Sequence, residues 1–229
     1  MTPERFAKLK QVLQRRQPDL TLVAENARNP QNLAALRRTC DAVGVLQMHA
    51  VSEQLIRRHH MVAAGSGKWL PLKRHQSMAA VCDELRDQGF QILAAHQSRH
   101  AVDFRDVDYT RPSAIVLGGE LWGVSATAAV AADRHITVPM HGQVRSLNVS
   151  VAAALVLYEA MRQREAVGYY ESSRLDPLTY QRLLFDWTHP GIARRCRQLG
   201  LPYPALDDDG NLLENPFARA EVRDSSQSR

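Results

Sequence analysis

Short apolar runs alternate with longer helical segments through most of the chain, and this alternation restricts the folds that are open to it. Five runs are expected to form strands: LTLVAE (20–25), VLQMHAV (45–51), FQILAA (90–95), SAIVLGG (113–119) and HITVPM (135–140). Strands without a polar face are typical of a parallel sheet that is covered by helices on both sides. The sequence therefore predicts an α/β fold, a mostly parallel sheet flanked by helices.

Helix-start and helix-stop signals separate these runs. Thr2 before Pro3 and Asp176 before Pro177 are each typical of an N-cap followed by the first helical position. Ser77 is expected to cap a further helix that Gly89 ends. The expected helices are 3–16, 32–43, 78–88, 125–132, 146–165, 175–187 and 191–200, with a helix end and a loop over 61–68.

Length and composition suit one α/β domain with appended helices, or at most two small domains. The chain has 229 residues, 45% of them hydrophobic, which is enough for a core that needs no disulfides. Its three cysteines form no CxxC pair, which argues against a disulfide framework and a cysteine-rich zinc site. The sequence has no apolar run of the roughly 20 residues that a membrane span needs. A cytoplasmic protein with no membrane partner is expected.

Charge and composition divide the chain into three expected parts. These are a basic helical extension at 1–18, a central α/β domain at 19–168, and a helical extension at 169–229 that ends in a disordered tail. The formal net charge is +5 and the sequence pI is about 9.4. Scattered arginines that converge in space are typical of nucleic-acid binding, but charge alone leaves a solvated surface equally open.

Three junctions between an expected strand and an expected helix carry the candidate functional residues. They are NPQNLAALRRTCDAVGV (29–45), IVLGGELWGVS (115–125) and VPMHGQVRSLNVS (138–150). The carboxyl ends of parallel strands form the ligand crevice of such a sheet, so these junctions are expected to meet there. The chain lacks the glycine patterns of dinucleotide and NTP sites, and also the GxSxG and HExxH motifs.

Taken together, the junctions resemble the motifs of the SpoU class of knotted RNA 2′-O-methyltransferases, in the SPOUT superfamily. The matching residues are Asn32 and Arg38 in the first motif, Leu117, Gly118, Glu120 and Gly123 in the second, and Pro139, Met140 and Ser146 to Ser150 in the third. Within that class, RRQPDLTLVAEN, VDFRDVDYTRP and RLDPLTYQRLLFDW resemble the tRNA guanosine-2′-O-methyltransferases of the TrmH family. The resemblance covers about residues 3–205.

The resemblance implies a deep trefoil knot in the C-terminal part of the 19–168 catalytic domain and a homodimer. It further implies transfer of a methyl group from S-adenosyl-L-methionine to the ribose 2′-hydroxyl of guanosine-18 in the D-loop of tRNA. A ribosomal RNA site or a tRNA anticodon-loop nucleotide is the alternative substrate within the class. A non-catalytic RNA-binding module of the same fold is the alternative outside it.

The resemblance also assigns roles to individual residues. The expected cofactor pocket consists of Ala95, Leu117, Gly118, Val138, Met140, Ser146 and Leu147, and the expected catalytic group of Arg38, Asn32, Glu120, Asn148 and Ser150. Candidates for tRNA phosphates are Arg5, Lys8, Arg15, Arg16, Arg194, Arg195 and Arg197.

Arg38 is the residue expected to support the reaction most directly. An arginine stays protonated, with a free pKa of about 12.5 or above, so it is expected to orient and stabilise the reacting oxygen and not to act as a base. Asn148 and Ser150 have two open uses, positioning the substrate or capping the helix. Trp122 stands where the class often has a smaller polar residue.

Overall fold

A computed structural model describes residues 1–26, 29–51, 69–119 and 122–218 of the chain. It divides into two compact units, one formed by residues 16–174 and the other by residues 1–15 together with the segment from 175 onward. No helix among the described residues is long and apolar enough to cross a membrane.

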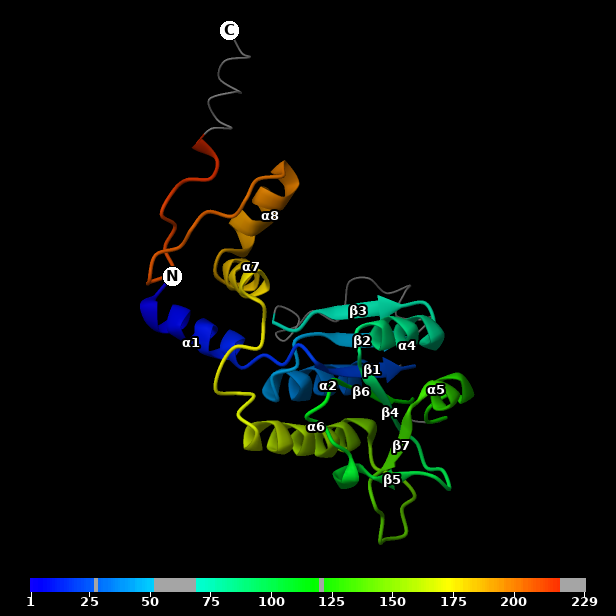
Figure 1. Ribbon diagram of the computed structural model, residues 1–229. Helices are drawn as coiled ribbons and strands as arrows, with labels where there is room; N and C mark the ends of the chain where they lie inside the picture. Colours follow the sequence, from blue (N-terminus) through cyan, green and yellow to red (C-terminus); the bar gives the residue numbers. More distant parts are fainter. Residues whose placement is uncertain (27–28, 52–68, 120–121, 219–229) are drawn as a thin grey trace. The chain divides into compact units, whose positions relative to one another are not determined.

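The larger unit is built on a parallel sheet (Figure 1). Its strands are β1 (Leu20–Glu25), β2 (Met48–Val51), β3 (Leu72–His75), β4 (Gln91–Ala95), β5 (Val102–Asp103), β6 (Ser113–Leu117) and β7 (Arg134–Thr137). They are ordered β3-β2-β1-β6-β4-β7-β5, and every neighbouring pair is parallel. The predicted parallel α/β sheet is confirmed. Sequence analysis missed β3, which carries charged exposed residues, and β5, which has only two residues.

Helices cover both faces of this sheet. Successive side chains of a strand point to opposite faces, so each strand packs against helices on both sides. Leu22 of β1 lies in the core shared with α2 (Pro30–Ala42) and α6 (Val149–Ala166). Val23 lies in the core shared with α4 (Met78–Asp87) and α5 (Ala126–Ala131). A short 3-10 helix, η2 (Phe104–Asp106), follows β5. The expected loop at 61–68 lies outside the described residues.

The strand order brings distant parts of the chain to one edge of the sheet. β6 lies between β1 and β4, and β7 lies beyond β4. The register pairs Ala24 with Leu117 and Ala95 with Ile136. Because the strands are parallel, the carboxyl ends of β6, β4 and β7 lie side by side. The trefoil knot implied by the sequence stays a prediction.

The smaller unit is helical and contains α1 (Pro3–Gln14), α7 (Pro177–Thr188) and α8 (Pro190–Leu199). The expected caps form: the Thr2 hydroxyl accepts from the Arg5 backbone N–H at 3.4 Å, and Asp176 accepts from that of Thr179 at 2.9 Å. α1 packs against α7, and α7 against α8. The two extensions that sequence analysis treated separately thus form one unit.

The boundaries of the larger unit lie a few residues outside the predicted range of 19–168. The Gln17 side-chain amide donates to the carbonyl oxygen of Tyr169 at 3.0 Å, and the Tyr170 hydroxyl donates to that of Val43 at 2.7 Å. Residues 16–18 and 169–174 therefore belong to the sheet domain. Such bonds join residues far apart in the chain, which composition alone does not indicate.

Arg164 connects α6 to the amino ends of the central strands. Its side chain is fully buried, and its Nη1 donates to the Asp19 carboxylate at 2.6 Å and to the Gln17 amide oxygen at 3.1 Å. Nε donates to the Tyr109 carbonyl at 2.8 Å, and Nη2 to the carbonyls of Asp19 at 3.0 Å and Arg111 at 3.1 Å. A buried charge is tolerated only when it is paired and hydrogen-bonded, as this one is.

Arg164→Ala should lower the free energy of unfolding by about 3–5 kcal/mol, because it leaves several backbone carbonyls without their donor and the Asp19 carboxylate with Arg174 as its remaining charged partner. Denaturant titration at fixed protein concentration measures this loss. Arg105→Ala is the matched control, since Arg105 is exposed and pairs with Asp103, and it should cost less than about 1 kcal/mol. Equal losses in the two variants would contradict the structural role of Arg164.

Candidate active site

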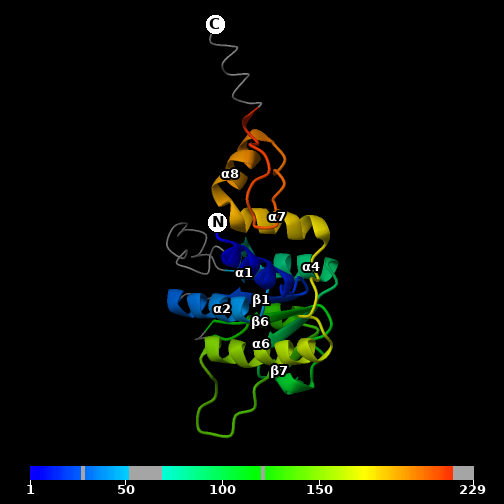
Figure 2. The same ribbon diagram turned by 90° about the vertical axis from the view of Figure 1, so that its left-hand side faces the viewer.

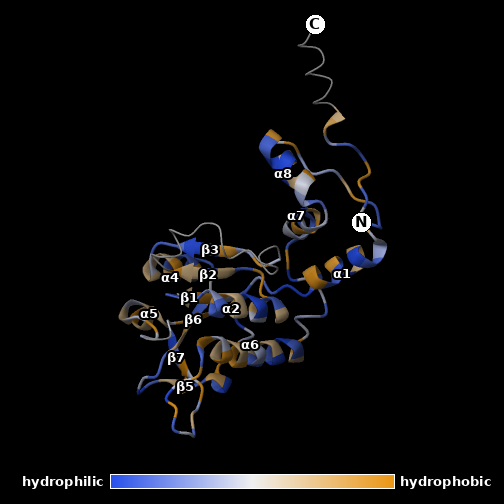
Figure 3. Cartoon of the chain, turned by 180° about the vertical axis from the view of Figure 1, so that it is seen from behind, coloured by the Kyte–Doolittle hydropathy of each residue, from blue (hydrophilic) through white to orange (hydrophobic). Residues whose placement is uncertain are grey.

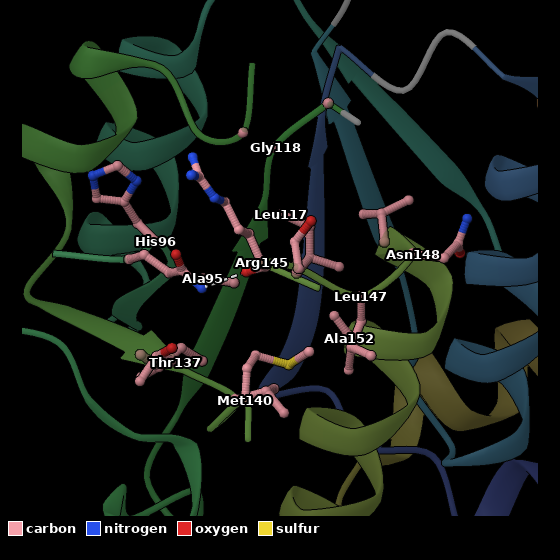
Figure 4. A pocket seen from close by; sticks show the side chains of 17 residues that line it. Ala95, His96, Leu117, Gly118, Thr137, Met140, Arg145, Leu147, Asn148 and Ala152 are labelled. Carbon is pink, nitrogen blue, oxygen red and sulfur yellow. Dashed lines mark hydrogen bonds between the residues drawn. The ribbon is translucent and has the colours of Figure 1, made fainter. Parts of the chain in front are cut away.

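A pocket of about 580 Å³ opens at the carboxyl ends of β6, β4 and β7. It is also lined by the loop that precedes α6 and by the first turn of that helix (Figure 4). The seven residues that sequence analysis assigned to the cofactor all line it: Ala95, Leu117, Gly118, Val138, Met140, Ser146 and Leu147. The structure thus brings three separate segments of the sequence to one concave site.

Gly118 permits a close approach of the backbone at one wall of the pocket. A Cβ at this position would lie 1.9 Å from the carbonyl carbon and oxygen of Gly123 and 2.1 Å from the Val124 nitrogen. The Gly123 N–H donates to the Gly119 carbonyl at 2.8 Å, and Gly123 has a φ of +63°. A tight turn therefore folds back on the end of β6, and only glycine fits at position 118.

A carboxylate that sequence analysis did not select holds the far end of this turn. Glu25, the buried last residue of β1, accepts from the Ser125 backbone N–H at 2.8 Å. Ser125 is itself the N-cap of α5. The turn after β6 is thereby anchored to the neighbouring strand. Glu120, which was expected to anchor it, lies outside the described residues.

The Ser-Leu-Asn turn ends in the cap of α6. The Asn148 side-chain oxygen accepts from the Ser150 backbone N–H at 2.9 Å and from the Ser150 hydroxyl. Its amide group donates to the side-chain oxygen of Asn32, on α2, at 3.4 Å. Asn148 lines the pocket. Asn148 thus caps α6 and also connects the first and third motifs, while the substrate-positioning use of Asn148 and Ser150 stays a prediction.

Arg38 does not line the pocket of its own chain. It lies exposed on α2, and no hydrogen bond or ion pair joins its side chain to another described residue. The adjacent Arg37 differs: it is buried and donates to the Leu70 carbonyl at 2.7 Å. Burial, with a smaller contribution from Arg74, lowers the pKa of the Arg37 guanidinium. Arg37 is therefore structural, whereas Arg38 is presented to solvent.

Sequence analysis missed several residues that line the pocket. His96, Gln97 and Thr137 adjoin predicted pocket residues at strand ends, so the same strand-end rule could have found them. Ala152 lies one turn into α6, and Arg145 lies in the loop before it. No local pattern identifies Ala152 and Arg145 as pocket residues, because their position depends on how the loop before α6 packs against the segment after β4.

Most of the basic residues expected to bind tRNA lie on the helical unit. Arg5, Lys8, Arg15, Arg194 and Arg195 are exposed there. Arg195 stacks on the Phe217 ring, 4.9 Å from its centroid. Arg197 is exposed but donates to Asp186 and Tyr203.

The prediction for Arg16 is wrong. Its side chain is fully buried in the larger unit and donates to the Asp41 carboxylate at 2.5 Å and to the Val45 carbonyl at 3.0 Å. These bonds occupy its guanidinium and hide it from solvent. Arg16 is therefore not available to an RNA phosphate.

Models of known protein families match most of the chain. The model of the SpoU rRNA Methylase family matches residues 19–158, and that of the SpoU rRNA methylase C-terminal region matches residues 162–215. The chain is 46% identical over 215 residues to the tRNA (guanosine(18)-2′-O)-methyltransferase of Escherichia coli K12, covering 93% of this chain and 94% of that protein. It is 48% identical over 187 residues to the enzyme of that name from Thermus thermophilus, covering 81% and 96%.

Solved structures of related proteins are also similar to this chain. The chain matches the Aquifex aeolicus TrmH/SpoU tRNA modifying enzyme with a TM-score of 0.74 at 40% identity, over 80% of this chain and 94% of that one. The SpoU methyltransferase AviRb from Streptomyces viridochromogenes, in complex with the cofactor AdoMet, matches with a TM-score of 0.57 at 25% identity, over 66% and 60%. The chain therefore belongs to the SpoU methylase family, which confirms the resemblance seen in its sequence.

Gly118→Ala should abolish binding of S-adenosylhomocysteine, the demethylated form of the expected cofactor, because the added Cβ forces Gly123 and Val124 away from the end of β6. Isothermal titration calorimetry measures this affinity. Gly142→Ala is the matched control, since a Cβ at that loop glycine meets no atom within 4 Å and φ is not positive. Unchanged affinity in Gly118→Ala would mean that the turn is not part of the ligand site.

Proposed function

We propose that this protein methylates the 2′-hydroxyl of guanosine-18 in tRNA. The observation that carries the proposal is the pocket at the ends of β6, β4 and β7, which brings together the second and third motifs of the family, with Asn148 of the third joined to Asn32 of the first. Relatives that match 81–93% of this chain at 46–48% identity are named for that reaction. This favours tRNA over ribosomal RNA, although the family model is described by ribosomal RNA.

The pocket fits S-adenosylmethionine as the methyl donor. Its volume of about 580 Å³ is suited to a ligand of nucleoside size, and pockets for small ligands span about 300–1,000 Å³. Apolar side chains such as Leu117 and Leu147 supply walls for a flat ring, and Gly118 exposes main-chain groups that can hydrogen-bond to its edge. When bound, this cofactor supplies a methyl group on a positively charged sulfur, and its transfer leaves a neutral thioether.

Arg38 is the proposed stabiliser of the reacting oxygen. A ribose hydroxyl is a weak nucleophile at neutral pH, so the charge that develops on its oxygen needs a nearby cation. Arg38 is exposed and free of a described protein partner, as such a role requires. Since a guanidinium does not give up its proton, the hydroxyl proton passes to an adjacent phosphate oxygen or to water. Arg38 can hold that phosphate with its remaining donors.

A homodimer completes the site in this proposal. Val151, Leu155 and Tyr158 form an apolar stripe on α6 and are 47%, 41% and 49% exposed. Their spacing of four and three residues places them on one helix face, and the opposite face is buried in the core. Apolar colours predominate along much of α6 in Figure 3. In the proposed dimer, a second copy of the chain covers this stripe. Such a contact is isologous, which means that the same surface of each subunit packs against that of the other.

The dimer supports a role for Arg38 in the pocket of the partner. α2 and α6 pack against each other (Figure 2), so Arg38 lies on the helix next to the proposed interface. Because Arg38 does not line the pocket of its own chain, it is proposed to reach the pocket of the second copy. Exposed basic residues of the helical unit, such as Arg5 and Arg194, are proposed to hold tRNA phosphates.

Incubation of the protein with S-adenosylmethionine and an unmodified tRNA transcript should produce 2′-O-methylguanosine at position 18, measured by mass spectrometry of nuclease fragments. A transcript with 2′-deoxyguanosine at that position should give no product. Arg38→Ala should lower the rate by about 100-fold or more, in the range for loss of a charge-stabilising donor, with cofactor affinity unchanged. Methylation of ribosomal RNA in place of tRNA would overturn the substrate assignment.

Mixed dimers test whether Arg38 acts across the interface. Arg38→Ala and Gly118→Ala chains, each inactive alone, should recover about a quarter of the wild-type rate when coexpressed, since half of the dimers are mixed and each holds one complete site. Adding Leu155→Arg to both chains should remove this recovery by separating the subunits. If Arg38 acts within its own chain, the mixture stays inactive.

A further inference from the structure

Arg145 is an unexplained cation in the wall of the pocket. Among the described lining residues it alone carries a permanent charge, and none of them is Asp or Glu. The motifs assign no role to Arg145. A pocket that receives a positively charged sulfur has no evident need of a further cation, because like charges repel.

The backbone of Arg145 is held in place by the segment that follows β4. The Gln97 side-chain amide donates to the Arg145 carbonyl at 2.8 Å, and the His96 backbone N–H donates to the Ile136 carbonyl at 3.1 Å. The loop that carries Arg145 is thereby joined to the segment after β4, which also lines the pocket. The position of Arg145 is thus set by the fold of the pocket.

The guanidinium itself is left for a ligand. Arg145 is exposed, and no hydrogen bond or ion pair joins its side chain to another described residue. Figure 4 shows it extending from the loop toward the side of the pocket where the His96 ring lies. Guanidinium groups form paired hydrogen bonds with carboxylates and phosphates, and both are planar or forked acceptors that suit its geometry.

We propose that Arg145 is an oxyanion-binding residue of this pocket. Its charge is then balanced by the ligand, since the described lining offers no acid to do so. The proposal rests on the proposed function, which brings two oxyanions to this place. One is the carboxylate at the amino-acid end of the cofactor, and the other is the phosphodiester next to the target ribose. In either case Arg145 positions a reactant and takes no part in the bond changes.

Binding measurements on Arg145→Ala and Arg145→Lys distinguish the two sources. If the carboxylate is the partner, Arg145→Ala weakens S-adenosylhomocysteine by about 10-fold or more, as expected for a charged hydrogen bond. Affinity for 5′-methylthioadenosine, which lacks the amino-acid end, then stays unchanged. If the phosphate is the partner, both small ligands bind normally. The tRNA dissociation constant then rises, and the slope of log affinity against log salt falls by about one.

Arg145→Lys, which keeps the charge but not the fork, should recover part of whichever affinity is lost. Arg99→Ala is the matched control, because Arg99 is an exposed arginine in the neighbouring segment and does not line the pocket. It should leave both small-ligand affinities unchanged. The proposal would be overturned if Arg145→Ala bound S-adenosylhomocysteine, 5′-methylthioadenosine and tRNA as the wild-type protein does. Weakened binding of 5′-methylthioadenosine in both variants would also overturn it, because that would indicate a purely structural residue.

These measurements do not require methyl transfer. If the wild-type protein methylates no tRNA but binds S-adenosylhomocysteine through Arg145, the proposed function fails and the oxyanion site stands. If the wild-type protein methylates tRNA and Arg145→Ala binds all ligands normally, the proposed function stands and the oxyanion site fails.

Discussion

The buried contact between Arg164 and Asp19 is the constraint on which the catalytic unit depends. Arg164 lies near the C-terminal end of α6, and its donors reach the start of β1 and the segment before β6. Fixing that end of α6 under the sheet also directs its other end, where Asn148 caps the helix at the pocket. A charge buried so completely is stable only with all its partners in place, so the helix has one position. A contact at the amino ends of the strands thus helps to position the helix that borders the pocket at their carboxyl ends.

The pocket is formed largely by backbone. β6 inserts between β1 and β4, so three strand ends meet although they are separate in the sequence. Gly118 allows the next turn to fold directly onto the end of β6, and Glu25 holds the start of α5. Main-chain groups exposed in this way can bind a nucleoside edge without demanding particular side chains. This accounts for a binding site whose lining is mostly small or apolar.

The arginines of the larger unit include buried ones that hold the fold together and exposed ones that are proposed to bind ligands. Arg16, Arg37 and Arg164 are buried and donate to the protein itself. Arg38 and Arg145 are exposed near the motifs and have no described protein partner. A guanidinium without a partner can form its hydrogen bonds with a ligand at little cost in reorganisation. Burial therefore separates the arginines that serve the fold from those that are proposed to bind ligands.

Much of the fold could be predicted from the sequence, because strand and helix signals are local. β1 lies at 20–25 as expected, and the caps at Thr2 and Asp176 form. The strand-end rule and the family motifs also identified seven cofactor-pocket residues that line the pocket, from Ala95 to Leu147. The sequence by itself thus determined the fold class, the family and the location of the pocket.

Only the tertiary structure decided which arginines are exposed and how the distant segments meet. Arg15 and Arg16 are adjacent and identical in type, yet Arg16 is buried because Asp41 and Val45, far along the chain, lie over it. The insertion of β6 beside β1, the partnership of Asn32 with Asn148 and the place of Arg145 have the same origin. Each depends on contacts between residues far apart in sequence, and local patterns carry no information about such pairs.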